Sequence, residues 1–173
     1  GTGDFAPDLL NPAHPQSTLV GIDLSEQMMQ IAKTKLNNRA TLMQANAEAI
    51  PFPDCTFHAV SVSFGIRNFT NRPAALSEMH RVLKPSGKLV ILELSSPDNP
   101  LLFALFKCYL TKIIPFIGGL ISGRRDAYRY LASSILQFPN PLQFKPVILQ
   151  SGFSKVTVHN FTFGICRMYI AQK

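Results

Sequence analysis

The stretch LVGID, residues 19–23, decides how this chain of 173 residues folds. Its apolar residues are typical of a buried parallel strand, and the strand ends in an acid, Asp23. The turn GTGD occupies residues 1–4, about 20 residues before that acid. A glycine turn lets backbone N–H groups approach a nucleoside cofactor, and an acid at a strand tip accepts hydrogen bonds from the ribose hydroxyls. The two features together predict a cofactor site.

A turn of this kind follows a strand, and no strand precedes residues 1–4. The sequence therefore predicts a chain that is truncated at its N-terminus and lacks the first, central strand of its sheet. Losing a central strand exposes the hydrogen-bonding edges of both neighbours, and the loss can exceed a total stability of about 5–15 kcal/mol. An inactive fragment that binds its cofactor weakly is one interpretation that this leaves open.

Helix and strand patterns alternate after residue 23. Ser25 suits a helix N-cap. Met28, Ala32 and Leu36 then recur on one helix face. The remaining signals are strands at residues 40–44, 57–64 and 88–94 and a helix that begins at Asn71. This alternation predicts an α/β fold with a doubly wound, Rossmann-like and mostly parallel sheet.

The second half of the chain departs from the alternation. Residues 97–141 favour two or three helices, and residues 143–150 favour another. Residues 154–160 and 165–172 favour two strands joined through Gly164, which predicts an antiparallel hairpin. We therefore expect a single domain over residues 1–173, with a helical insertion at about 97–141 that forms a lid over the substrate.

Composition narrows the classes of partner. The net charge is +7, but the basic residues are scattered and only Arg124 and Arg125 are adjacent, so no stripe for nucleic acid is expected. A mild preference for anionic lipid fits the same charge. The three cysteines are far apart, which favours small core residues in a reducing compartment over a disulfide framework. No pair of the four histidines has metal-ligand spacing, so we expect no metal site.

One apolar segment resembles a membrane-spanning helix, namely LLFALFKCYLTKIIPFIGGLI at residues 101–121. Its length is close to the ~20 residues that span a bilayer. However, Lys107 and Lys112 lie inside it, and each costs about 2.5–3.5 kcal/mol at the bilayer centre. Pro115 and the pair Gly118-Gly119 should also break a helix. We expect buried helices, or an apolar lid, in place of a span.

The chain resembles class I S-adenosylmethionine (SAM) methyltransferases in six stretches, residues 1–4, 19–25, 44–53, 63–72, 81–94 and 123–138. More narrowly, it is similar to the C-methyltransferases of ubiquinone and menaquinone biosynthesis. That similarity rests on NAEAIPFP at residues 46–53, on SFGIRNF at residues 63–69, and on YRYL at residues 128–131 with Ser134. FGIRN followed by YRYL at this distance is specific, and the similarity runs almost from end to end.

The resemblance implies that SAM is held by eight residues, Gly1, Thr2, Gly3, Asp4, Asp23, Asn46, Ala47 and Ser63. Asn46 stands where the family usually has Asp, and its carbonyl can still accept from the adenine amino group. Other roles stay open for several of these residues, and Gly1 to Gly3 could form an ordinary glycine turn. Asp4 could stabilise a helix N-terminus, Asp23 could be an N-cap, and Asn46 could be a turn residue.

The resemblance places Arg67 and Asn68 at the substrate end of the pocket. Methylation of a ring carbon needs a phenolate-like ring, and a guanidinium stabilises that oxyanion or fixes a water that accepts the proton. An arginine stays protonated in proteins and is a poor base, so we assign Arg67 electrostatic work, with a surface or salt-bridge arginine as the alternative. Tyr128 and Tyr130 lie on the helix that covers the quinone pocket. Tyr130 is the third catalytic candidate, beside Arg67 and Asn68. The alternative is that Tyr130 has only a structural role and packs in the core or at its rim.

The resemblance implies methyl transfer from SAM to a ring carbon of a polyprenylated quinol, either demethylmenaquinol or 2-methoxy-6-polyprenyl-1,4-benzoquinol. A methyltransferase that acts on another lipid is the second enzyme interpretation. The implied partners are a lipid quinol, the surface of a membrane and a second copy in a homodimer, with no nucleic acid. The implied location is the cytoplasm, including the inner face of the membrane.

Overall fold

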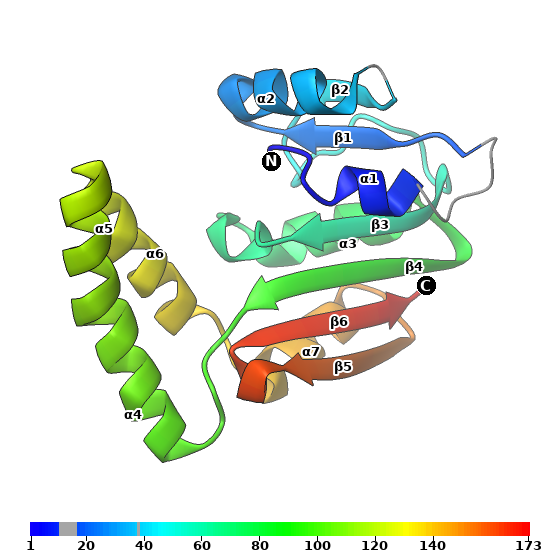
Figure 1. The fold of residues 1–173 in the computed structure, drawn as a ribbon. Helices are drawn as coiled ribbons and strands as arrows, with labels where there is room; N and C mark the ends of the chain where they lie inside the picture. Colours follow the sequence, from blue (N-terminus) through cyan, green and yellow to red (C-terminus); the bar gives the residue numbers. More distant parts are fainter. Residues whose placement is uncertain (11–16, 38) are drawn as a thin grey trace.

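The computed structural model describes residues 1–10, 17–37 and 39–173. Its strands form a parallel pair and a separate four-stranded sheet in the order β3-β4-β6-β5 (Figure 1). The strands are β1 (Val20–Asp23), β2 (Thr41–Gln44), β3 (Phe57–Ser63), β4 (Leu83–Leu94), β5 (Lys155–Phe161) and β6 (Cys166–Gln172). β3 is parallel to β4, and β6 is antiparallel to both β4 and β5. The predicted closing hairpin is confirmed, and its second strand lies inside the sheet, next to β4.

The parallel pair and the larger sheet are not joined by a ladder within the described residues. β1 pairs only with β2 there, and β3 pairs only with β4, so β1 and β3 turn unpaired edges toward each other (Figure 1). A missing central strand would leave its two neighbours in this state. The arrangement agrees with the predicted absence of the first strand.

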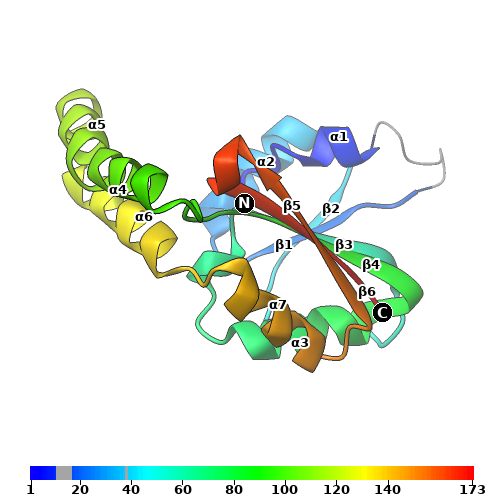
Figure 2. The same ribbon diagram turned by 90° about the horizontal axis from the view of Figure 1, so that it is seen from below.

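Helices cover both faces of the sheet, as a doubly wound fold requires. Figure 2 shows α1 (Ala6–Leu10) and α2 (Glu26–Leu36) on one side, with α3 (Arg72–Val82) and α7 (Pro141–Gln150) on the other. The predicted caps are present, because Ser25 accepts from the Met28 N–H and Asn71 accepts from the Ala74 N–H. Asn37 ends α2 in the left-handed conformation, whereas its neighbour Asn38 lies outside the described residues.

The main core lies between the larger sheet and the helices α3 and α7. Leu76, Ile91 and Ile148 are fully buried in it. Phe144 of α7 packs edge-on against Tyr169 of β6, with ring centroids 5.1 Å apart. A smaller cluster of Ala6, Ala32 and Leu36 holds α1 and α2 against the parallel pair. Met28 was expected on that face but is 43% exposed, so this part of the prediction is wrong.

The helical insertion is more continuous than the sequence suggested. α4 (Pro100–Cys108), the π-helical segment η2 (Tyr109–Ile113) and α5 (Ile114–Ser122) follow one another without a break, and we call this run the arm. It lies beside the sheet with α6 (Arg125–Gln137) packed along it (Figure 1). Pro115 and Gly118-Gly119 therefore do not break the helix. The wider π turn precedes Pro115, which has no N–H to donate and sits in the first turn of α5.

The arm and two of the cysteines are exposed to solvent, although the sequence suggested that they would be buried. The arm, with 23 residues at Pro100–Ser122, is long and apolar enough to cross a membrane by length and composition alone, yet only 17% of its most apolar window is buried. The prediction of buried helices therefore fails. Cys55 and Cys108 are exposed, so they are not the small core residues that the sequence suggested.

Candidate functional site

The candidate residues gather at the carboxyl ends of β1, β2 and β3, on one edge of the sheet (Figure 1). Asp23 is the last residue of β1, Asn46 follows the end of β2 by two residues, and Ser63 is the last residue of β3. Open α/β sheets bind ligands at this edge, outside the carboxyl ends of the strands. The N-terminus of the chain lies there too, beside the tip of β1.

Asp23 presents a carboxylate at the tip of β1. Its Oδ1 accepts from the Ser25 backbone N–H at 2.7 Å, and its Oδ2 contacts the ammonium group of Gly1. Burial raises the pKa of Asp23, but the Gly1 ammonium and the Ser25 N–H more than offset this and hold the pKa below its ordinary value. Ser25, and not Asp23, caps α2, so the N-cap alternative for Asp23 is wrong.

The turn at residues 1–4 is held against α2. Gly3 has φ +73°, and a Cβ on it would lie 3.2 Å from the Ala32 Cβ, so this position favours glycine. The Asp4 carboxylate accepts from Lys35 and from the Thr2 hydroxyl, and its side chain is 62% exposed. The Lys35 hydrogen bond is the main cause that lowers the pKa of Asp4. Asp4 thus fixes the turn, and its approach to a ligand stays a prediction.

Asn46 opens the loop after β2. Its Oδ1 accepts from the Glu48 N–H at 2.9 Å, and its backbone carbonyl accepts from the Ala49 N–H at 3.0 Å. Asn46 therefore has the turn role that the sequence left open. An amide oxygen has two lone pairs and the amide nitrogen has two protons, so a contact with adenine is still compatible with this turn. Its neighbour Ala47 packs partly against the main core.

Arg67 lies in the short helix η1 (Ile66–Asn68), directly after β3, and its guanidinium is fixed by three partners. Its Nη1 donates to Glu93 Oε1 and to the Phe64 carbonyl, both at 2.6 Å, and its Nε donates to the Ser134 hydroxyl at 3.3 Å. The side chain is only 11% exposed. Arg67 is thus a nearly buried salt-bridge arginine as well as a residue at the candidate site.

The backbone beside Arg67 is strained. Phe64 has φ +55°, a conformation that non-glycine residues rarely adopt. This turn directs the Phe64 carbonyl at the Arg67 guanidinium while the Phe64 N–H still donates to the Leu92 carbonyl of β4. Such strain concentrates at functional sites. Arg72 of α3 supports the turn, because it donates to the carbonyls of Ile66 and Arg67.

Glu93 is the site residue that the sequence analysis did not identify. It is fully buried in β4 and accepts from the Arg67 backbone N–H as well as from its guanidinium. Its cross-strand partner is Arg167, which is fully buried. The Arg167 Nη2 lies 2.7 Å from Asp98 Oδ1, and its Nη1 donates to the Ser95 hydroxyl. The available signal was an acid directly after the apolar run LVIL at residues 89–92, since a buried acid requires a partner.

Asn68 and Tyr130 meet although 62 residues separate them. The Tyr130 hydroxyl donates to Asn68 Oδ1 at 3.0 Å, which joins α6 to η1. Ser134 lies one helical turn further along α6 and receives the Arg67 hydrogen bond. The three catalytic candidates of the sequence therefore form one cluster. Tyr128 lies elsewhere, because its ring packs on Gly118 between α5 and α6.

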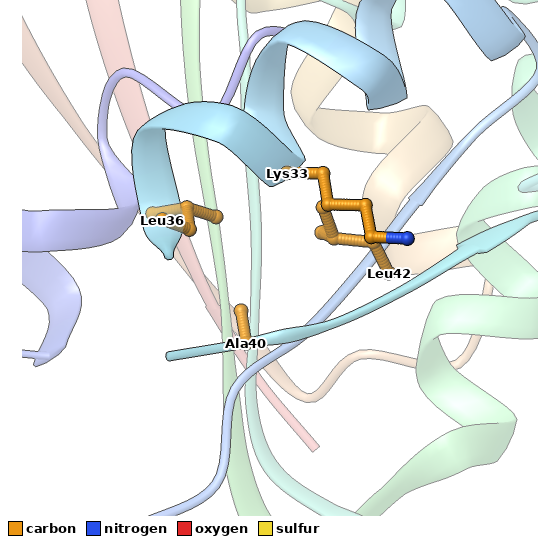
Figure 3. A pocket seen from close by; sticks show the side chains of 4 residues that line it. All are labelled: Lys33, Leu36, Ala40 and Leu42. Carbon is orange, nitrogen blue, oxygen red and sulfur yellow. The ribbon is translucent and has the colours of Figure 1, made fainter. Parts of the chain in front are cut away.

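Two pockets lie away from this cluster. The first, of about 100 Å³, lies between α2 and β2, where Leu36 and Lys33 extend from the helix toward Ala40 and Leu42 (Figure 3). The second, of about 760 Å³, lies between the β4–α4 connection, the start of α7 and β5. No predicted site residue lines either pocket. The described part of the chain also contains no group of three His, Cys, Asp or Glu side chains placed to hold a metal ion.

Comparison with known proteins decides the family. The model of the ubiE/COQ5 methyltransferase family matches residues 1–173, which is the full length of the chain. The chain belongs to this family. The resemblance seen in the sequence is thereby confirmed, and so is the assignment as a SAM-dependent C-methyltransferase.

The chain is shorter than the curated relatives that it matches. A ubiquinone/menaquinone biosynthesis C-methyltransferase of Geobacter sulfurreducens is 42% identical over 178 aligned positions, which cover 100% of the chain and 69% of the relative. An enzyme with the same description from Syntrophotalea carbinolica is 45% identical, with 98% of the chain and 72% of the relative covered. The chain thus lacks a part of its relatives' length, as the sequence predicts.

Solved structures confirm the fold. A SAM-dependent methyltransferase of Aquifex aeolicus superposes with a TM-score of 0.70 at 18% identity, over 99% of the chain and 77% of that protein. A Thermotoga maritima methyltransferase, described as a possible histamine N-methyltransferase, gives a TM-score of 0.68 at 19% identity, over 100% of the chain and 78% of that protein. The ubiE/COQ5 family member therefore has the class I methyltransferase fold, and family and fold together support SAM as its methyl donor.

Proposed function

We propose that the chain transfers a methyl group from SAM to a ring carbon of a polyprenylated quinol, as an enzyme of menaquinone or ubiquinone biosynthesis. The observation that carries the proposal is the cluster of Arg67, Asn68 and Tyr130 at the carboxyl end of β3. The descriptions of the curated relatives, which name ubiquinone and menaquinone biosynthesis, support the substrate class.

The cofactor would lie along the tips of β1, β2 and β3. Its predicted partners are Gly1, Thr2, Gly3, Asp4, Asp23, Asn46, Ala47 and Ser63. The chemistry of the donor set fits a nucleoside, because Asp23 is an ionised acceptor that is still 27% exposed. When bound, SAM supplies an electrophilic methyl group, and the chain's own residues position the acceptor ring.

Arg67 would act on the quinol oxygen. The Glu93 carboxylate and the Phe64 carbonyl fix its Nη1, and Ser134 fixes its Nε, so the guanidinium is held before the ring arrives. Preorganised donors stabilise a developing phenolate without reorganisation during the reaction. The buried Glu93 carboxylate compensates part of the positive charge, which favours a positioning and hydrogen-bonding role over that of a free cation.

Asn68 and Tyr130 would close the other side of the ring site. Tyr130 is 59% exposed and reaches η1 from α6, so its hydroxyl is available to a ring oxygen once it leaves Asn68. On this proposal residues 1–173 act as one domain, and the insertion at about residues 97–141 is the lid over the quinol. We place the enzyme in the cytoplasm, where it meets its lipid substrate at the inner face of the membrane.

The test is methyl transfer with a labelled donor. Purified chain is incubated with radiolabelled SAM and, in separate reactions, short-chain demethylmenaquinol and 2-methoxy-6-prenyl-1,4-benzoquinol. Label on a ring carbon of either quinol supports the proposal. Transfer to another lipid in a total lipid extract, with neither quinol labelled, would favour the second enzyme interpretation. Donor binding without any transfer would refute the substrate assignment.

A further inference from the structure

The arm carries large apolar side chains that the described part of the chain does not cover. Nine of its large apolar side chains are exposed, namely Leu101, Leu102, Leu105, Tyr109, Ile113, Phe116, Ile117, Leu120 and Ile121. Their exposed fractions reach 70% at Leu101 and 82% at Ile121. Exposed apolar patches of this extent mark contact with another molecule or with a membrane.

The opposite side of the arm already has its partner. Leu110 is buried with Ala132 and Ile135 of α6, and Gly118 lies against the ring of Tyr128. The spacing from Leu101 through Leu105, Tyr109 and Ile113 is four residues, and the wider π turn of η2 falls within this row. The arm is thus a two-sided helix, with one side in the protein and an apolar side that faces outward.

The charges of the arm and of the start of α6 are mostly positive. Between Pro100 and Arg129 the chain has five basic residues, Lys107, Lys112, Arg124, Arg125 and Arg129, and all five are exposed. Asp126 is the single acid in that stretch. An exposed apolar face on a helical segment whose exposed charges are mostly basic complements the anionic surface of a membrane. Contact between two copies of the arm would instead bring like charges together.

The arm would lie in the membrane interface and not cross the bilayer. Lys107 and Lys112 stand near its middle, where a span would bury two ammonium groups in hydrocarbon. In the interfacial position their long side chains reach the lipid head groups. The packing of α6 along the inner side also prevents lipid from surrounding the arm.

We propose that the arm docks on the surface of an anionic lipid bilayer through this apolar side. The docking would place α6, whose Tyr130 and Ser134 contact η1, directly between the membrane and the candidate site. A polyprenylated substrate could then reach the site from the bilayer. Only this last consequence rests on the proposed function, because lipid docking itself requires no turnover.

The chain has no tryptophan, so a single introduced tryptophan reports its own position without background. Phe116→Trp places the reporter on the apolar side of the arm, where Phe116 is 59% exposed. Leu142→Trp is the matched control, since Leu142 is 86% exposed at the start of α7 and lies outside the arm. Emission is measured with phosphatidylglycerol vesicles, with phosphatidylcholine vesicles, and with vesicles that contain brominated lipid.

We expect phosphatidylglycerol vesicles to shift the Phe116→Trp emission to shorter wavelength, brominated lipid to quench it, and neither change with Leu142→Trp. The double variant Leu120→Ser, Ile121→Ser should bind these vesicles at least about tenfold more weakly, while Leu142→Ser binds as the parent does. Circular dichroism verifies that each variant is folded. The proposal would be overturned if phosphatidylglycerol vesicles left the Phe116→Trp emission unchanged. It would also be overturned if the chain bound phosphatidylcholine vesicles as tightly as phosphatidylglycerol vesicles. A dimer of the parent chain that the double variant converts to a monomer would assign the surface to a second copy.

Discussion

Nη1 of Arg67 lies 2.6 Å from Oε1 of Glu93, and the Glu93 side chain is completely buried. The pair joins η1, which carries the candidate catalytic residues, to β4 at the centre of the larger sheet. Glu93 also accepts from the Arg67 backbone N–H, so one carboxylate fixes both the main chain and the side chain of this residue. The position of the guanidinium is therefore set by the core of the protein.

Glu93→Ala should destabilise the fold strongly. Removing the carboxylate leaves a nearly buried guanidinium without its partner, which costs about 3–5 kcal/mol. Asp126→Ala is the control, because Asp126 forms an exposed pair with Arg129 and its removal should change stability by less than about 1 kcal/mol. Urea unfolding of both variants measures the difference. Equal losses would show that the Arg67–Glu93 pair contributes nothing specific.

Tyr130→Phe should impair turnover with little effect on stability. The substitution removes the hydrogen bond to Asn68, and the side chain is 59% exposed, so the free energy of unfolding should change by about 0.5 kcal/mol or less. We expect a rise in KM for the quinol and unchanged binding of SAM. Tyr128→Phe serves as the control, since Tyr128 packs on Gly118 outside the cluster. Identical kinetics of the two variants would remove Tyr130 from the site.

Asp23→Asn should weaken donor binding selectively. Asparagine has the size of aspartate but lacks its charge, and hydrogen bonds to a charged acceptor are worth about 1.5–3 kcal/mol. Calorimetry should show a SAM Kd that is at least about tenfold higher. Asp8→Asn is the matched control, because Asp8 is an exposed acid of α1, and it should leave the Kd for SAM unaltered. The same Kd for Asp23→Asn and the parent would exclude Asp23 from the cofactor site.

Glu78 should make stability depend on pH. It accepts from the Ile50 N–H and from two guanidinium nitrogens of Arg81, and these hydrogen bonds from Arg81 are the main cause that holds its pKa below the ordinary value of 4.5. A lowered pKa adds stability that is fully present above that ordinary value and is lost as the pH falls through the lower, folded-state pKa. Glu78→Gln should therefore cost about 1 kcal/mol near pH 7, and the difference should vanish in acid. A difference that is the same at both pH values would contradict this account.

Alternation of apolar runs and cap residues was enough to predict most elements of the fold. Ser25 and Asn71 cap α2 and α3 as expected, and the hairpin of β5 and β6 closes the sheet. The same local reasoning fails for Pro115, because the π turn that accommodates it is not visible in residue propensities. It also fails for Met28 and Cys108, whose exposure depends on which elements pack against them.

In the candidate site, too, sequence patterns predict some residues and only the tertiary structure reveals the others. Arg67, Asn68 and Tyr130 could be named from the sequence because short motifs carry them, and the structure brings all three together. Glu93 and Ser134 hold Arg67 from positions 26 and 67 residues away, and only the tertiary fold reveals such contacts. Ser134 belongs to a motif that the sequence shows, but its contact with Arg67, like that of Glu93, follows only from the geometry.

The most direct test of the central claim is the kinetics of Arg67→Lys with SAM binding measured in parallel. Lysine keeps a positive charge opposite Glu93 but cannot reproduce the fixed fork of the guanidinium. We predict that kcat for quinol methylation falls by about 100-fold while the SAM Kd stays within about twofold of the parent value. A folded Arg67→Lys variant that methylates the quinol at the parent rate would contradict the claim that Arg67 positions and stabilises the reacting ring.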